Sequence, residues 1–281
     1  MTLAEFFTQT YSLERDITDS TRKFFLLKIV QFTRWLGHHA TLDDLTSHTV
    51  NRFIAHRITE RARETARGER AVLHALWKAA FDAGLKEDRP DRVRVVKRSL
   101  KPVEGWDSPE VSRLLAVATN LTGCFRGHDV ERAAFWRAVI LTLYDSGLRL
   151  GDLLAIDAAQ LHPPSFTVIQ SKTRKPVVVT LSPSTWEEVA AIHPKRRKKP
   201  FGDVLCRRYF FDVFAELCDK AGLAGRTKML RRTSGSLVER LHPGEGHLHL
   251  GNTRQVFDQH YHIRRLTDKP PRLPPRLGGV G

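Results

Sequence analysis

The first 85 residues alternate helical stretches with short polar breaks. Apolar side chains recur at spacings of three and four in STRKFFLLKIVQFTRWLG (20–37) and in AVLHALWKAAFDAGL (71–85). This spacing places them on one face of an α-helix. Residues suited to helix ends stand at the breaks: Asp19 or Ser20, Thr41 and Ser47 at N-termini, and Gly84 at a C-terminus. The pattern predicts an all-helical domain over residues 1–88.

The helical period is lost in KEDRPDRVRVVKRSLKPVEG, residues 86–105, which also contains Pro90 and Pro102. Proline and mixed charge without periodicity are typical of a connection between domains. We therefore predict a basic linker over residues 89–106. Its six Lys or Arg residues between Arg89 and Lys101 fit two alternatives equally, a solvated connector and a segment that follows a phosphate backbone.

A second domain is expected over residues 107–265. Ser108-Pro109 and Ser182-Pro183 are typical helix starts, with a capping hydroxyl followed by proline at the first helical position. Three apolar stretches predict further helices: 133–144, 210–223 and 229–241. Between them, SFTVIQ and PVVVTL are rich in β-branched residues and flank the polar tract SKTRK, which predicts a two-stranded hairpin. The fold class is therefore mainly α, with one small sheet, and a basic, proline-rich tail follows over 266–281.

Length and composition fit a soluble protein with two cores. The chain has 281 residues, of which 41% are hydrophobic and 27% charged, and domains usually have about 100–200 residues. Apolar stretches such as 136–144 are too short to cross a bilayer, and the N-terminus lacks the basic region of a secretory signal. We therefore expect a cytoplasmic protein with no membrane association. Cys124, Cys206 and Cys218 lack metal-ligand spacing, so we expect buried thiols and no metal site.

The chain is strongly basic. Its net charge is +15 and its pI is about 10.2, and a positive field of this size favours association with polyanions. Residues 223–281 hold eleven Lys or Arg against four Asp or Glu. Nucleic acid is therefore the expected partner, and a generally basic soluble protein without such a partner is the alternative.

Four segments contain residues suited to phosphate chemistry. In chain order they are SGLRLGD (146–152), SKTRK (171–175), KMLRR (228–232) and LGNTRQVFDQHY (250–261). Cleavage of a phosphodiester without a metal needs cations on the non-bridging oxygens, a nucleophile in line and an acid for the leaving oxygen. Arginine suits the first task because its planar guanidinium binds phosphate bidentately.

The order and spacing of these segments resemble the active site of the tyrosine recombinase (phage integrase) family. The resemblance implies that Arg149 and Arg231 bind the phosphate and that Asp152 orients Arg149. It further implies that Lys172, in the hairpin turn, gives a proton to the leaving oxygen, and Lys175 is the alternative donor. Tyr261 would be the nucleophile. The N-terminal helices would form a core-binding (SAM-like) domain, and the C-terminal domain would be catalytic.

Two positions depart from the family pattern. Lys228 stands where the family has histidine, and Asn252 stands where it has histidine or tryptophan. Lysine retains a positive charge but is a poorer proton shuttle near neutral pH, because its reference pKa is about 10.4. Asparagine can still donate a hydrogen bond, although it cannot carry a proton. Three nearby residues are alternative sources of an imidazole: His247, His249 and His260.

Each motif residue also has a structural alternative. Arg149 can be a surface arginine at a helix start, and Lys172 a solvated residue of a turn. Asn252 with Gln255 resembles a capping box for the last helix. Tyr261 can pack on the core from a helix face. Arg231 and Arg232 can contact the DNA backbone without taking part in cleavage, and Lys175 and Arg254 are further expected DNA contacts.

By this resemblance, the expected function is a site-specific DNA recombinase or integrase of a mobile element. It would cleave and rejoin double-stranded DNA through a 3′-phosphotyrosyl intermediate, as a homo-oligomer (a tetramer) associated with the nucleoid, and without a cofactor. A catalytically impaired DNA-binding accessory protein of the same fold is the first alternative, supported by Lys228 and Asn252. A type IB topoisomerase-like enzyme that relaxes supercoils as a monomer is the second.

Overall fold

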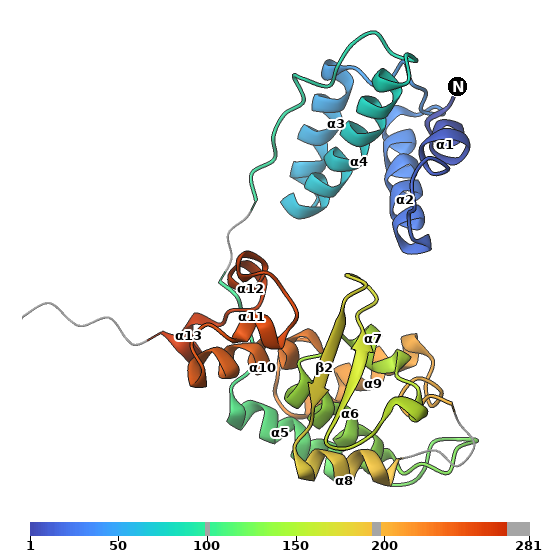
Figure 1. Cartoon of the computed structure of the whole chain (residues 1–281). Helices are drawn as coiled ribbons and strands as arrows, with labels where there is room; N and C mark the ends of the chain where they lie inside the picture. Colours follow the sequence, from blue (N-terminus) through green and yellow to red (C-terminus); the bar gives the residue numbers. More distant parts are fainter. Residues whose placement is uncertain (99–101, 193–197, 269–281) are drawn as a thin grey trace, which may run out of the picture. The chain divides into compact units, whose positions relative to one another are not determined.

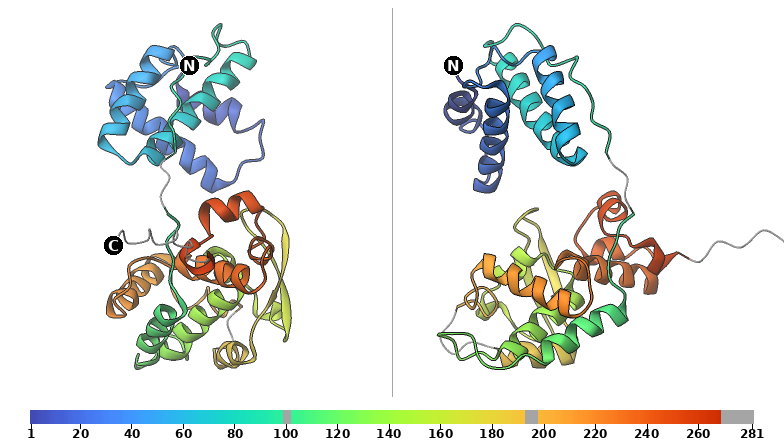
Figure 2. Two further views of the ribbon diagram at one scale, coloured as in Figure 1. Left: turned by 90° about the vertical axis from the view of Figure 1, so that its left-hand side faces the viewer. Right: turned by 180° about the vertical axis from the view of Figure 1, so that it is seen from behind.

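The computed structural model describes residues 1–98, 102–192 and 198–268. The chain divides into two compact units, Met1–Lys101 and Pro102–Gly281 (Figures 1 and 2). Each unit has its own hydrophobic core.

Unit 1 is an all-helical bundle. Its elements are α1 (Leu3–Phe6), continued by a π-helical turn (Phe7–Tyr11), α2 (Asp19–Leu36), α3 (Ser47–Glu60) and α4 (Arg63–Asp82). Phe6, Phe32, Phe53 and Trp77 are fully buried and form the centre of its core. The expected sequence of helices is therefore present.

The helix starts lie close to the predicted caps but not on them. Thr18 and Thr46 cap α2 and α3, and in each helix the hydroxyl accepts the backbone N–H three residues later. Asp19, Ser20 and Ser47 are already helical. Thr41 caps no helix, because its N–H and hydroxyl donate to Asp44 in a turn.

The segment after α4 packs onto unit 1. Val93 and Val96 are buried in its core. Asn51 of α3 donates to the carbonyl of Arg92 and accepts from the N–H of Arg94. This part of the predicted linker, within residues 89–98, is therefore fixed to the helices, whereas its residues 102–106 belong to unit 2. Residues 99–101 lie outside the described residues.

Unit 2 is helical with one hairpin. Its helices are α5 (Ser108–Thr119), α6 (Arg132–Ser146), α7 (Leu150–Ala155), α8 (Pro183–Ala191), α9 (Arg207–Lys220), α10 (Lys228–Leu241), α11 (Gly246–His249), α12 (Arg254–His260) and α13 (Arg264–Thr267), with a 3₁₀ turn at Ala158–Gln160. Helix α6 is buried along most of its length and contacts α5, α8 and α10 (Figure 1). It therefore forms the centre of the unit.

Strands β1 (Ser165–Ile169) and β2 (Pro176–Thr180) form the antiparallel hairpin, with Ser165 opposite Thr180 and Ile169 opposite Pro176. Alternate residues Phe166, Val168 and Val179 are buried. The turn between the strands carries Lys172 and Lys175. The predicted fold class, mainly α with one small sheet, is confirmed.

Two local predictions about unit 2 are wrong. Asp107, not Ser108, caps α5, in a capping box with Glu110. Cys124 and Cys206 are exposed, since they lie in a loop before α6 and at the N-terminus of α9, and only Cys218 is buried as expected. Among the described helices, none is long and apolar enough to cross a lipid bilayer.

A buried ion cluster links three helices of unit 1. Glu69 of α4 is fully buried and accepts from Nε and Nη2 of Arg57, on α3, at 2.9 Å each. Nζ of Lys28, on α2, lies 3.7 Å from its Oε1. Removal of one partner from such a cluster leaves uncompensated buried charge.

Replacement of Glu69 by alanine should lower the free energy of unfolding by about 3–5 kcal/mol. Lys28 would lose its carboxylate, and Arg57 would keep only the half-exposed Glu60, at 3.3 Å. Urea denaturation of the full chain, followed by circular dichroism, measures the loss. Glu64→Ala is the control, since it removes the exposed pair with Arg67 and should cost less than about 0.5 kcal/mol. Equal losses for the two variants would contradict the prediction.

Candidate active site

Arg149 stands at the junction of α6 and α7. Helix α6 ends at Gly147 in the left-handed conformation (φ 59°), and Arg149 is the N-cap residue of α7. Its Nη1 donates to Oε1 of Gln170 at 2.8 Å, and its Nη2 donates to Oδ1 of Asn252 at 3.2 Å. The guanidinium is thus held between the end of β1 and the α11–α12 turn.

Asp152 lies on the first turn of α7 with its side chain fully buried. One carboxylate oxygen accepts from the N–H and the hydroxyl of Ser171, at 2.9 and 2.6 Å. The other lies 3.8 Å from Nη1 of Arg149. Asp152 therefore links the hairpin turn to α7 and faces Arg149.

Arg231 lies on the first turn of α10 and is 3% exposed. Its Nη1 donates to the carbonyl of Gly147, and its Nη2 donates to the carbonyl of Leu250 at 2.7 Å. Burial, together with the charge of Arg149, lowers the pKa of Arg231 to about 10. The guanidinium still remains charged at neutral pH.

Tyr261 follows directly after α12 as its C-cap residue. Its backbone carbonyl accepts from the hydroxyl of Ser236 at 3.0 Å. The centroid of its ring lies 5.0 Å from Cζ of Arg231 and 5.4 Å from Nζ of Lys228. Burial alone would raise the pKa of Tyr261, but the charge of Arg231 and then that of Lys228 lower it below its usual value.

Lys228 is the first residue of α10. Burial, and then the charge of Arg232, lowers its pKa. Lys172 is close enough for its charge to lower that pKa further. The hairpin lysine and the tyrosine therefore approach the same cationic cluster.

A cavity of about 380 Å³ opens beside Arg149. Its polar lining includes Arg149, Lys172, Lys175 and Asn252. The apolar side chains around it include Val177, Leu248 and Val256. The structure thus gathers four of the predicted residues around one basic hollow. The charge of Arg149 further lowers the pKa values of Arg231 and Tyr261, and the charge of Lys172 further lowers that of Lys228.

Asn252 does not cap α12, so the capping alternative is wrong. Thr253 is the N-cap residue, and its hydroxyl accepts the N–H of Val256. The side-chain oxygen of Asn252 is instead occupied by Arg149. Its buried Nδ2 has no hydrogen-bond partner among the described residues.

The nearby histidines lie outside this cluster or are held in the neutral form. Nε2 of His249 lies 2.7 Å from the hydroxyl of Ser234. Burial, and then the charge of Arg231, lowers the pKa of His249 to about 4. His247 and His260 meet the site through backbone carbonyls, which accept from the N–H of Asn252 and from Arg232.

Of the three expected DNA contacts, Lys175 is exposed in the hairpin turn. Arg254 is paired with Glu239 and Asp258, at 2.7 and 3.1 Å. Arg232 is half-buried and donates to two backbone carbonyls. Arg254 is also exposed but carries two ion pairs, and Arg232 bonds to protein.

The sequence analysis missed Gln170, the last residue before the hairpin turn. It is 1% exposed, accepts from Arg149 and donates to the carbonyl of Leu250 at 3.2 Å. A glutamine at the end of a strand gives no sequence signal for this role. Its partners lie 21 and 80 residues away.

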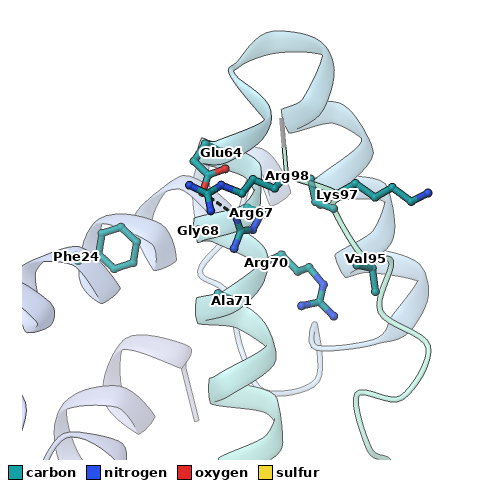
Figure 3. A pocket seen from close by; sticks show the side chains of 10 residues that line it. Phe24, Glu64, Arg67, Gly68, Arg70, Ala71, Val95, Lys97 and Arg98 are labelled. Carbon is teal, nitrogen blue, oxygen red and sulfur yellow. Dashed lines mark hydrogen bonds and ion pairs between the residues drawn. The ribbon is translucent and has the colours of Figure 1, made fainter. Parts of the chain in front are cut away.

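A second basic hollow, of about 700 Å³, lies within unit 1. Figure 3 shows Arg67 and Arg70 of α4 beside it, together with Lys97 and Arg98 of the segment that follows. Phe24 of α2 supplies an aromatic ring. This hollow was not anticipated from the sequence.

No protein-family model and no curated protein matches the sequence. Solved structures do match it. A lambda integrase dimer bound to a COC′ core site is similar with a TM-score of 0.73 and 18% identity, over 98% of this chain and 100% of that chain. The chain has the tyrosine recombinase fold.

Two further structures share this tyrosine recombinase fold. The XerH site-specific recombinase bound to palindromic difH substrate has a TM-score of 0.69 and 15% identity, over 88% of this chain and 76% of that chain. The Tn1549 transposon integrase in complex with a circular intermediate DNA has a TM-score of 0.64 and 12% identity, over 93% and 96%. The fold inferred from the motifs is thus present throughout most of the chain.

Replacement of His249 by glutamine should make the free energy of unfolding less sensitive to acid. The pKa of His249 is about 4 in the folded chain and about 6.5 when unperturbed. The unfolded state therefore binds the proton first, and stability is lost as the pH falls from 6.5 toward 4. Between pH 7 and 4.5, the wild type should lose roughly 2–3 kcal/mol more than His249→Gln. Urea denaturation at both pH values measures this difference, and equal losses would refute it.

Proposed function

We propose that the protein is a site-specific DNA recombinase or integrase that cleaves and rejoins DNA through a 3′-phosphotyrosyl bond to Tyr261. One observation carries the proposal. The phenol of Tyr261 lies over the guanidinium of Arg231 and beside the ammonium of Lys228, and its pKa is lowered. A tyrosine among cations is suited to attack a phosphate as a phenolate.

The groups around Tyr261 provide an anion site. Nε of Arg231 and Nδ2 of Asn252 are buried donors without a partner among the described residues. Buried donors are normally satisfied, and a phosphate oxygen is an acceptor suited to them. Arg149 adds a second guanidinium. Asn252 would thus act by hydrogen bonding, in the place where the family has an imidazole or indole.

In the proposed reaction, the phenol loses its proton to water and Oη of Tyr261 bonds to phosphorus. The bond from phosphorus to the 5′ oxygen breaks, and that oxygen takes a proton from Lys172 or, as the alternative, from Lys175. The 5′-hydroxyl of a partner strand then reverses the step. Because Tyr261 meets Arg231 within one chain, each protomer would cleave with its own tyrosine.

Double-stranded DNA is the proposed partner. The net charge of +15 and the basic hollows of the two units supply the cations that such binding requires. The similar lambda integrase structures include a dimer on a core site and a tetramer on a Holliday junction. We propose a homo-oligomer on DNA for this chain as well.

The test is covalent capture of DNA. The full chain is incubated with a pool of nicked duplexes of random sequence, and adducts that resist SDS are isolated. The nick lets the short cleaved strand leave, so that rejoining fails and the adduct accumulates. The wild type should give an adduct, whereas Tyr261→Phe should give none, because it lacks the attacking oxygen. Tyr209→Phe, at an exposed tyrosine, is the control and should behave as the wild type.

An adduct that persists in Tyr261→Phe would overturn the assignment of the nucleophile. Binding without an adduct would favour the impaired accessory protein. Relaxation of supercoiled plasmid by a monomer without sequence preference would favour the topoisomerase-like alternative.

The residue that protonates the leaving 5′ oxygen can be identified with a substrate in which that oxygen is replaced. Lys172→Ala should slow single-turnover cleavage about 10²- to 10⁴-fold. A substrate with sulfur at the bridging 5′ position should restore the rate, because a thiolate leaves without a proton. Lys175→Ala, in the same turn, is the matched control and should cleave both substrates normally. If sulfur rescues Lys175→Ala instead, the donor is Lys175.

A further inference from the structure

Arg232 joins two distant backbone segments of unit 2. Its Nε donates to the carbonyl of His260 at 3.0 Å, and its Nη1 donates to the carbonyl of Glu104 at 2.7 Å. His260 is the residue before Tyr261. Glu104 lies in the segment 102–107, which leads from the unit boundary into α5.

The segment after α12 makes four further contacts with the entry segment and the start of α5. Nη2 of Arg265 donates to the carbonyl of Gly105 at 2.7 Å and to Glu110 at 3.1 Å. Ile263, 1% exposed, packs so closely on Gly105 that a Cβ there would lie 2.1 Å from its Cδ1. Nη1 of Arg265 also lies 3.7 Å from Asp107. The segment after α12 is therefore clamped to the entry segment.

Helix α10 forms hydrogen bonds with both segments. Thr233 accepts from the N–H of Trp106 and donates to its carbonyl, at 3.1 and 2.6 Å. Ser236 donates to the carbonyl of Tyr261 and accepts from the N–H of Ile263, at 3.0 and 2.8 Å. Arg232, on the same helix, is the side chain that bonds to both segments at once.

We propose that Arg232 is a positioning residue rather than a DNA contact: by holding the carbonyls of His260 and Glu104 together, it sets where Tyr261 lies over Arg231 and Lys228. The proposal deepens the proposed function, on which it rests. It also makes the entry segment part of the support of the nucleophile. A displacement of residues 102–107 would then move the phenol.

The test uses Arg232→Lys in the full chain. Lysine retains the charge but lacks the planar fork that reaches two carbonyls. Arg240→Lys, the same change at an exposed position of α10, is the matched control. The chain contains four tyrosines, so labelling with 3-fluorotyrosine gives four ¹⁹F resonances, and Tyr261→Phe assigns the relevant one.

In Arg232→Lys, the resonance of Tyr261 should move, and its lowered pKa should rise. Arg240→Lys should leave both unchanged. Adduct formation at saturating DNA should slow about 10- to 100-fold, since small misplacements of reacting groups have effects of this size. The affinity for a random-sequence duplex and its dependence on salt should not change.

Two results would overturn the proposal. One is a Tyr261 resonance that stays in place. The other is a slope of log K against log salt that becomes shallower by about 0.9 when Arg232 is replaced by alanine, because the loss of one phosphate contact has this effect and lysine would keep the charge. If the wild type forms no adduct, the proposed function fails, but the resonance of Tyr261 still tests the positioning role.

A second variant covers the case in which Arg232→Lys does not fold, which the resonances of Tyr11, Tyr144 and Tyr209 would reveal. Gly105→Ala adds no charge and forces Ile263 away from the entry segment. It should also move the resonance of Tyr261, and an unchanged resonance would again overturn the proposal.

Discussion

The arrangement of unit 2 depends on one buried guanidinium. Arg231 donates to the carbonyl of Gly147, at the α6–α7 turn, and to that of Leu250, at the α11–α12 turn. These turns carry Arg149 and Asn252. The guanidinium of Arg231 also packs against the ring of Tyr261. A charge in a buried position is tolerated when it is well hydrogen-bonded, and here the acceptors of its two Nη groups belong to the two turns that shape the pocket.

Much of the fold could be predicted, because it follows from local pattern. Apolar spacing located the long helices of both units, and the β-branched stretches on either side of SKTRK located the hairpin. Helix starts were displaced by a residue because several capping residues stand side by side, as at Thr18, Asp19 and Ser20. Local pattern favours any of them, and only the backbone conformation before the first turn selects Thr18.

For the candidate site, the sequence predicted the motif residues but not the contacts that hold them in place. Motif spacing indicated the side chains that the structure gathers, including Arg149, Arg231 and Tyr261. It could not indicate Gln170 or the two carbonyls held by Arg232, because these contacts join residues 21 to 128 positions apart. Arg232 was predicted to contact DNA, and its Nε and Nη1 donate to carbonyls of the protein. Such contacts arise from tertiary packing, which a single sequence does not encode in any short pattern.

The acceptors that hold the site together are largely peptide oxygens. Arginine side chains and Gln170 donate to the backbone carbonyls of five residues: Gly147, Leu250, His260, Glu104 and Gly105. A point substitution can change the bulk of Leu250, yet it cannot delete the oxygen that its backbone presents. A framework of this kind allows side chains to diverge over evolution while the geometry persists. It gives a physical reason why a chain 18% identical to lambda integrase can still superpose on it over nearly its whole length.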